Sequence, residues 1–132
     1  MTNLVFDSYA MIAHFKKEKG HEQVSELLSE ISAGDKAGFI SLINLGEIYY
    51  ILHRTYGQKH ADQSVKIVQQ MPLEIVGIDL NLTINAAKYK AVHRLSYADA
   101  FAAALTKSKR GLLVTGDKEF KSLEGEIKVK FI

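Results

Sequence analysis

The 132-residue sequence contains no cysteine. It can therefore form no disulfide bond, no thiolate nucleophile and no cysteine-ligated zinc site, and this composition fits a reducing compartment. No run of apolar residues approaches the ~18 that a membrane-spanning helix needs. The first ten residues, MTNLVFDSYA, lack the basic start and the long apolar stretch of a signal peptide. These absences predict a cytoplasmic protein that does not enter a membrane.

A strong charge of either sign is also missing. The formal net charge is +2, which is too small to indicate nucleic-acid binding by itself. Lysine and arginine cluster at residues 16–19 and 107–110, where they either complement the dipoles of helix ends or contact phosphates. Hydrophobic residues make up 47% and charged residues 24% of the chain, which is an ordinary globular composition. The length predicts a single domain over residues 1–132.

Short apolar runs alternate with helical patterns through the whole chain. The sole proline, Pro72, ends one of the helical patterns. Strands are predicted at 4–7, 38–41, 73–79, 112–116 and 127–132, and helices at 8–20, 21–32, 42–57, 60–71, 82–94 and 97–110. The last strand alternates in the manner of an edge strand. This order favours an α/β fold with three α/β/α layers around a mainly parallel sheet of roughly five strands.

Two acidic residues follow predicted strands directly. Asp7 comes after the first strand and Asp117 after the fourth. In open parallel sheets, ligands bind beyond the carboxyl ends of the strands, so both side chains are expected at the same edge of the sheet. Each also has a purely structural interpretation. Asp7 is placed to cap the helix that follows it, and Asp117 is a typical turn residue beside Gly116.

Glu47 lies inside a predicted helix and not at its end. It shares a helical face with Ile43 and Ile51, four residues to either side. A carboxylate among aliphatic side chains is costly unless a cation or a metal pairs with it. Glu47 lies between one and two turns beyond the end of the second strand, so it is expected at the same edge as the first two acids. The alternative is a rim position from which the carboxylate reaches water.

A fourth acid, Asp99, lies in the stretch SYAD, three residues after Ser96. This spacing also fits a capping box, in which the acid bonds back to the start of the helix. Four carboxylates at one edge would repel each other, and Lys118 is the only cation beside a strand end there. Oxygen ligands suit hard cations such as Mg²⁺ or Mn²⁺. The sequence therefore predicts metal-assisted attack of water on a phosphodiester.

Other polar residues are assigned supporting roles or none. Ser8 and Thr115 carry hydroxyls that either orient a carboxylate or a metal-bound water, or serve in capping and turn bonds. Asn44 lies one turn before Glu47 and is within reach of the same edge. Asp79 also follows a predicted strand, but we assign it no role. The five histidines show no metal-ligand spacing and are interpreted as surface or packing residues.

Four segments carry a resemblance to a known family. In chain order, LVFDSYA, SLINLGEIYY, LSYADAFAAALT and LLVTGDKEF resemble the PIN-domain family, in particular the VapC-type toxins of toxin–antitoxin pairs. The resemblance covers nearly the full chain and implies a single PIN-like nuclease domain. It implies an endoribonuclease that depends on Mg²⁺ or Mn²⁺, forms a homodimer and is held inactive by a cognate antitoxin protein. The acids of the family's site fall on Asp7, Glu47, Asp99 and Asp117, and the hydroxyl of its turn falls on Thr115. We expect Asp7, Asp99 and Asp117 to hold the metal, and Glu47 to bind the metal or its water and to help form the nucleophile.

One departure and several rival functions bear on this interpretation. The departure is Tyr9, a bulky residue two positions after Asp7, which is expected to alter how the groove of the site accepts RNA. Tyr9 also occupies the position where a phosphatase with an aspartate nucleophile carries its second aspartate. A phospho-acceptor receiver domain needs paired acids after the first strand and a lysine loop after the fifth, and neither is present. The alternative that stays open is a non-catalytic module on the same fold that binds RNA or protein.

Overall fold

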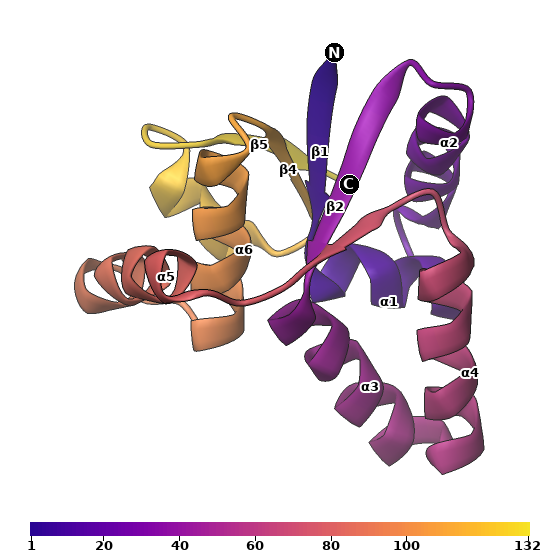
Figure 1. Cartoon of the computed structure of the whole chain (residues 1–132). Coiled ribbons are helices and arrows are strands. Elements are labelled where there is room, and N and C mark those ends of the chain that lie inside the picture. The colour runs from indigo at the N-terminus through magenta and orange to yellow at the C-terminus, as the bar shows by residue number, and fades with distance from the viewer.

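A computed structural model describes residues 1–132 (Figure 1). Five parallel strands form one sheet in the order β3-β2-β1-β4-β5. The strands are β1 (Thr2–Phe6), β2 (Lys36–Ser41), β3 (Glu74–Val76), β4 (Leu112–Thr115) and β5 (Lys128–Phe131). The predicted five-stranded parallel sheet is thus confirmed, and β5 lies at an edge as expected. β1 occupies the centre, so the residues that follow it lie in the middle of the carboxyl edge.

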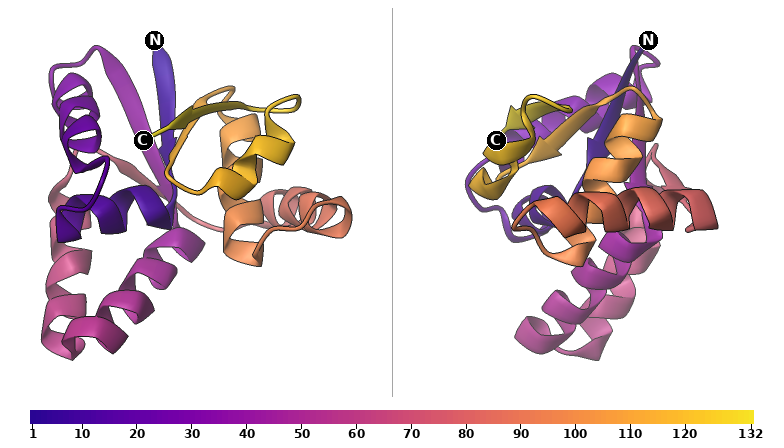
Figure 2. Two further views of the ribbon diagram at one scale, coloured as in Figure 1. Left: turned by 180° about the vertical axis from the view of Figure 1, so that it is seen from behind. Right: turned by 90° about the vertical axis from the view of Figure 1, so that its left-hand side faces the viewer.

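Helices cover both faces of the sheet, as the two further views show (Figure 2). One face packs against the first four helices, α1 (Ser8–Lys16), α2 (His21–Ser32), α3 (Leu42–Tyr56) and α4 (Gln58–Gln70). The other face packs against α5 (Leu80–Val92), α6 (Tyr97–Ser108) and the 3₁₀ helix η1 (Lys118–Leu123). The predicted three-layer α/β/α architecture is confirmed. None of the helices is both long and apolar enough to cross a bilayer.

The period-two pattern of the central strand explains why the sheet has two cores. Leu4 and Phe6 belong to the core beneath the first four helices, whereas Val5 belongs to the core beneath α5 and α6. All three side chains are fully buried, because a parallel strand covered on both faces has no solvent side. Four alanines of α6, at positions 100, 102, 103 and 104, are buried as well, and their small size permits close packing of that helix on the sheet.

The main differences from the prediction are two boundaries and one short helix that was not predicted. The first helix was expected to reach Gly20, but it ends at Lys16, since Lys17 adopts a left-handed conformation (φ 53°) and donates its N–H to the carbonyl of Ala13. Gly20 (φ 93°) instead precedes α2. The strand predicted over 73–79 forms ladder pairs only over Glu74–Val76, because its partner β2 ends at the same level and turns into α3. η1 was not predicted.

The helices α3 and α4 pack on each other and extend beyond the carboxyl edge of the sheet (Figure 1). α3 starts there because Ser41, the last residue of β2, accepts a hydrogen bond from the N–H of Asn44 (3.0 Å) and so caps the helix. α3 also contacts α6 and α1. The carboxyl edge is therefore enclosed by the N-terminal parts of three helices.

Candidate active site

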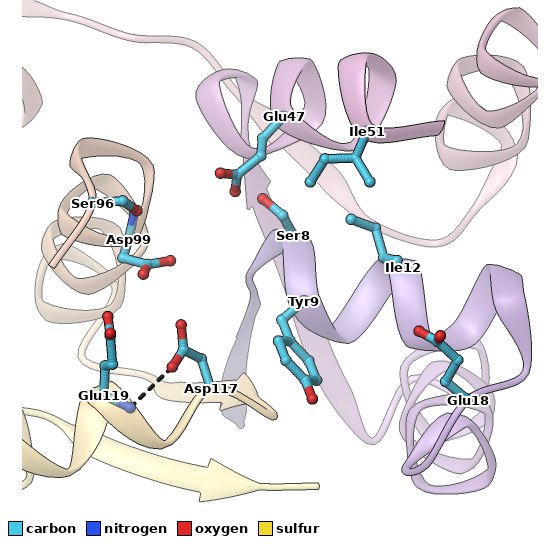
Figure 3. Close-up of a pocket in the computed structure, with 10 residues that line it drawn as sticks. All are labelled: Ser8, Tyr9, Ile12, Glu18, Glu47, Ile51, Ser96, Asp99, Asp117 and Glu119. Atoms are coloured by element: carbon cyan, nitrogen blue, oxygen red, sulfur yellow. Dashed lines mark hydrogen bonds between the residues drawn. The ribbon is translucent and has the colours of Figure 1, made fainter. Parts of the chain in front are cut away.

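A cleft of about 470 Å³ opens at the carboxyl edge of the sheet (Figure 3). Its walls come from α1, α3, α6 and the segment that leads from β4 into η1. Charged and polar side chains dominate the lining, which includes Ser8, Glu47, Ser96, Asp99, Asp117 and Glu119. Three of the four acids singled out in the sequence thus meet in one cleft, although they lie on three different elements.

The fourth acid, Asp7, is buried beneath the cleft. Its side chain is 1% exposed. Oδ1 accepts a hydrogen bond from the N–H of Ala10 (2.8 Å), and Oδ2 accepts one from the hydroxyl of Thr115. Burial raises the pKa of this carboxyl from its ordinary 3.8 to about 7, the bonds from Thr115 and Ala10 lower it, and the charges of Asp99 and Asp117 raise it further. Asp7 therefore caps α1 and also belongs to the electrostatic cluster.

The turn after β4 positions Asp117 through Thr115. The backbone N–H of Asp117 donates to the hydroxyl oxygen of Thr115 (3.0 Å), whose own proton goes to Asp7. Oδ1 of Asp117 accepts from the N–H of Glu119 (2.9 Å) and so caps η1. One carboxylate oxygen of Asp117 therefore caps η1, as the structural interpretation expects, while the side chain faces the cleft (Figure 3).

Asp99 lies in the first turn of α6 and directs its carboxylate into the cleft (Figure 3). The N–H of Asp99 donates to the hydroxyl of Ser96 (3.1 Å), but the reciprocal bond of a capping box, from the N–H of Ser96 to the carboxylate, is absent. Burial raises the pKa of Asp99 from its ordinary 3.8 to about 7, and the charges of Asp117, Glu47 and Glu119 add to the rise, while the Ser96 hydroxyl lowers it.

Glu47 lies on the α3 side of the cleft and faces Asp99 (Figure 3). It is half-buried, and the hydroxyl of Tyr50 approaches its Oε2 at 3.5 Å. Of the two isoleucines expected beside it, Ile51 lines the cleft and Ile43 is largely exposed. The carboxylate thus occupies the rim position that the sequence left as an alternative, at the edge of the sheet that the sequence predicted.

Asn44 is the polar residue that joins the helices around the cleft. It is 0% exposed. Its amide nitrogen donates to the hydroxyl of Ser8 (3.2 Å) and to the carbonyl of Ala98 (3.3 Å), and its amide oxygen accepts from Ser41 (2.6 Å). Ser8 in turn donates to the Asn44 carbonyl (3.3 Å). The Ser8 hydroxyl thus bonds to Asn44 and not to a carboxylate, and a role of Ser8 toward a metal-bound water stays a prediction.

The structure adds a fifth acid that sequence reasoning missed. Carboxylate oxygens of Asp99, Asp117 and Glu119 all lie within 4.8 Å of one another. Glu119 stands two residues after Asp117, and the tight winding of η1 returns it to the cleft. A prediction of that 3₁₀ helix would have revealed it. Asp79, by contrast, caps α5 through the N–H of Leu82 (2.8 Å) and takes no part in the cleft.

The sequence as a whole matches the family model described as "PIN domain" over residues 4–126. The chain belongs to the PIN-domain family. No curated protein sequence matches it.

Solved PIN-fold structures of low sequence identity share the whole architecture. VapBC2 from Rickettsia felis, bound to a DNA fragment from its promoter, superposes with a TM-score of 0.77 at 19% identity, over 99% of this chain and 99% of that one. DNA-bound VapBC from Salmonella typhimurium gives 0.75 at 19% identity, over 99% and 98%. VapC20 from Mycobacterium tuberculosis, a toxin that cleaves the sarcin–ricin loop, gives 0.73 at 18% identity, over 94% and 95%.

The acids of this PIN domain fit a hard divalent cation. Their donors are carboxylate oxygens, the ligand type that Mg²⁺ and Mn²⁺ prefer. No lysine, arginine or histidine forms an ion pair with Asp7, Glu47, Asp99, Asp117 or Glu119. Mutual repulsion contributes to the raised pKa values of Asp7 and Asp99, and a bound cation would relieve it. Asp99, Asp117 and Glu119 are spaced to share one ion.

Proposed function

We propose that this PIN-domain chain is a metal-dependent endoribonuclease that hydrolyses RNA phosphodiester bonds. The observation that carries the proposal is the convergence of Asp99, Asp117 and Glu119, whose carboxylate oxygens lie within 4.8 Å of one another without any cationic partner. Among solved structures of the same fold, VapC20 from Mycobacterium tuberculosis is a toxin that cleaves the sarcin–ricin loop, which supports RNA as the substrate class.

Each acid has a distinct part in the proposed reaction. Asp99, Asp117 and Glu119 would hold Mg²⁺ or Mn²⁺, with Asp7 beneath them. When bound, the ion lowers the pKa of water and stabilises the charge that develops on the phosphate oxygens. Glu47, which is partly exposed and faces Asp99, is placed to accept the proton of the attacking water. Thr115 holds Asp7 in one orientation through its hydroxyl.

We also propose that the protein is the toxin of a toxin–antitoxin pair and acts in the cytoplasm as one domain over residues 1–132. Two proteins of similar fold were solved as VapBC with DNA and another as a toxin–antitoxin complex, which supports a cognate antitoxin as partner. A homodimer follows from the family resemblance. Large apolar side chains exposed along α5, at Leu80, Ile84 and Val92, offer a surface for it.

A cleavage assay with matched variants tests the nuclease. The purified chain is incubated with total bacterial RNA in Mn²⁺ or in EDTA, and new 5′ ends are sequenced. Wild type is expected to cut only in Mn²⁺, whereas Asp7→Asn and Asp99→Asn do not cut. Asp79→Asn is the matched control, since this acid caps a helix outside the cleft and asparagine caps as well as aspartate. Cutting by all three variants would contradict the assignment, and binding without any cutting would favour the non-catalytic module.

Expression in a bacterial host tests the toxin. Induction of the wild-type chain alone is expected to stop growth, whereas cells that express Asp99→Asn should continue to grow. The Asp79→Asn control should be as toxic as wild type, because the cleft is unchanged. Equal toxicity of the wild type and the Asp99→Asn variant would show that growth arrest does not come from the proposed nuclease site.

A further inference from the structure

The cleft has an apolar side next to its acidic side. Tyr9, Ile12 and Ile51 line it together with the acids, and they are its only hydrophobic residues. In Figure 3, Tyr9 projects from α1 beside Asp117, and the side chains of Ile12 and Ile51 point toward one another from α1 and α3. None of these three residues has a part in the chemistry proposed above.

Tyr9 is held against the turn that carries Asp117. A Cβ atom on Gly116 would lie 2.1 Å from Cε1 and 2.6 Å from Cδ1 of the Tyr9 ring, so the ring rests on the bare backbone of the glycine. Gly116 does not have a positive φ, which means that the ring and not the backbone conformation requires glycine there. The aromatic ring thus lies against Gly116, the residue next to a proposed metal ligand.

The fold makes little use of the Tyr9 side chain. It is 51% exposed, and its hydroxyl forms no hydrogen bond with the protein. A large aromatic surface that is positioned by close contact yet open to solvent is suited to a flat ligand. The acidic side of the cleft also repels an RNA chain wherever no cation intervenes. Binding of RNA therefore needs a favourable contact beside the acids that does not depend on charge.

We propose that Tyr9, flanked by Ile12 and Ile51, is a subsite for an unpaired nucleobase of the RNA next to the scissile phosphate. The inference rests on the proposed function and specifies its substrate. Bases stack on aromatic side chains only where they are not stacked in a duplex, so the subsite selects single-stranded segments or loops. Stacking tolerates different bases because every base has a π face. Tyr9 is accordingly a positioning residue that places the adjacent phosphate over the acids.

Binding is measured with variants that remove the ring or displace it. The background is Asp7→Asn, which blocks cleavage, and the probe is a ten-nucleotide unstructured RNA with one central 2-aminopurine. Removal of a stacking side chain weakens binding by about five- to a hundredfold, so this loss is expected for Tyr9→Ala, while Tyr9→Phe retains affinity. Quenching of 2-aminopurine fluorescence is expected with the parent chain and with Tyr9→Phe, but not with Tyr9→Ala. Tyr56→Ala is the matched control, since Tyr56 is 48% exposed and lies outside the cleft.

Gly116→Ala supplies a second, independent variant. The added methyl displaces the ring, so this change should weaken binding on its own but should have no further effect once Tyr9 is alanine. Such non-additivity is the signature of two residues that act through one contact. The subsite would be overturned if the parent and the Tyr9→Ala chain bound the probe equally well. It would also be overturned if the effects of Tyr9→Ala and Gly116→Ala were additive, or if the parent did not bind the probe.

A cleavage assay distinguishes an error in the subsite from an error in the proposed function. In chains that retain Asp7, Tyr9→Ala is expected to raise KM at least about fivefold. If wild type cuts RNA and Tyr9→Ala leaves KM unchanged, the nuclease stands and the subsite is wrong. If wild type cuts no RNA in Mn²⁺, the proposed function is wrong and the subsite falls with it.

Discussion

The hydroxyl of Thr115 donates a hydrogen bond to Oδ2 of Asp7, although 108 residues separate them in the sequence. Thr115 ends β4, and Asp7 directly follows the neighbouring central strand β1. The same hydroxyl oxygen accepts the N–H of Asp117 (3.0 Å). One threonine therefore fixes the buried acid beneath the cleft and the acid in the turn above it.

Thr115→Val is expected to reduce cleavage without unfolding the protein. Valine has nearly the shape of threonine, but it leaves Oδ2 of Asp7 and the N–H of Asp117 without their partner. Loss of a bond to a buried group costs about 1–3 kcal/mol of unfolding free energy. Loss of the orientation of Asp7 and Asp117 should lower kcat by about tenfold or more. Urea unfolding and single-turnover cleavage measure the two effects. Thr115→Ser keeps the hydroxyl, so its stability and its kcat should both stay near those of wild type. An unchanged kcat in the valine variant would contradict the role of Thr115 in orienting the two acids.

The fold was predictable because its signals are local. The apolar runs around Leu4, Ile40 and Leu113 alternate with helical patterns, and that order alone predicts a parallel sheet covered by helices. The end of β3 was not predictable in the same way. Ile75 and Ile78 look equally strand-like in the sequence, but only the first has a partner, since β2 stops at Ser41.

The site was predictable only in part. Asp7 and Asp117 were found because strand ends mark the edge where ligands bind. Glu119 was missed because it returns to the cleft only through η1, whose apolar residues Phe120 and Leu123 do not reveal a 3₁₀ helix. The contact between Tyr9 and Gly116 joins α1 to the turn after β4, and no local pattern in the sequence encodes such a contact.

Mn²⁺ is expected to raise the melting temperature of the wild-type protein. An ion at 100 times its dissociation constant stabilises the folded state by about 2.7 kcal/mol, or about 10 °C for a chain of this size. Asp99→Asn should abolish the rise and Glu47→Gln should blunt it, whereas Asp79→Asn should keep it. Differential scanning fluorimetry with and without Mn²⁺ checks this without any RNA. An identical rise in wild type and Asp99→Asn would place the metal elsewhere.

Glu119→Gln tests the acid that the structure adds. The carboxylate lies within 4.8 Å of those of Asp99 and Asp117, so its removal should weaken Mn²⁺ binding by about tenfold, in the range typical for a group that supports a metal site. Glu124→Gln is the matched control, because Glu124 follows the same 3₁₀ helix but is exposed and does not line the cleft. Isothermal titration with Mn²⁺ compares the two variants. Equal affinities would exclude Glu119 from the site.

Without divalent metal, the protein should lose stability as the pH rises. The pKa of Asp7 in the folded state is about 7, above its ordinary 3.8, and that of Asp99 is raised to about 7 as well. Between pH 3.8 and about pH 7 the folded state holds protons on Asp7 and Asp99 that the unfolded state has released. The stabilisation of the folded state that comes from these protons is therefore complete below about pH 3.8 and is lost as the pH passes about 7. Urea unfolding in EDTA between pH 5 and pH 8 should show this decline. Asp7→Asn should flatten it, and Asp79→Asn should follow wild type. A stability that rises over this range in wild type would show that the buried acids are not protonated.

Asn44→Ala should destabilise the protein through the helices around the cleft. The side chain is 0% exposed and bonds to Ser8, Ser41 and the carbonyl of Ala98, so its removal breaks three hydrogen bonds that join α3 to α1, β2 and α6. Each lost bond to a buried group costs about 1–3 kcal/mol, and the melting temperature should fall by about 4 °C for every kcal/mol. The exposed Asn81→Ala on α5 serves as control and should stay near wild type. Because Asn44 contacts no acid, Mn²⁺ should still stabilise the folded fraction of the variant. A loss of the Mn²⁺ response at unchanged melting temperature would instead make Asn44 part of the metal site.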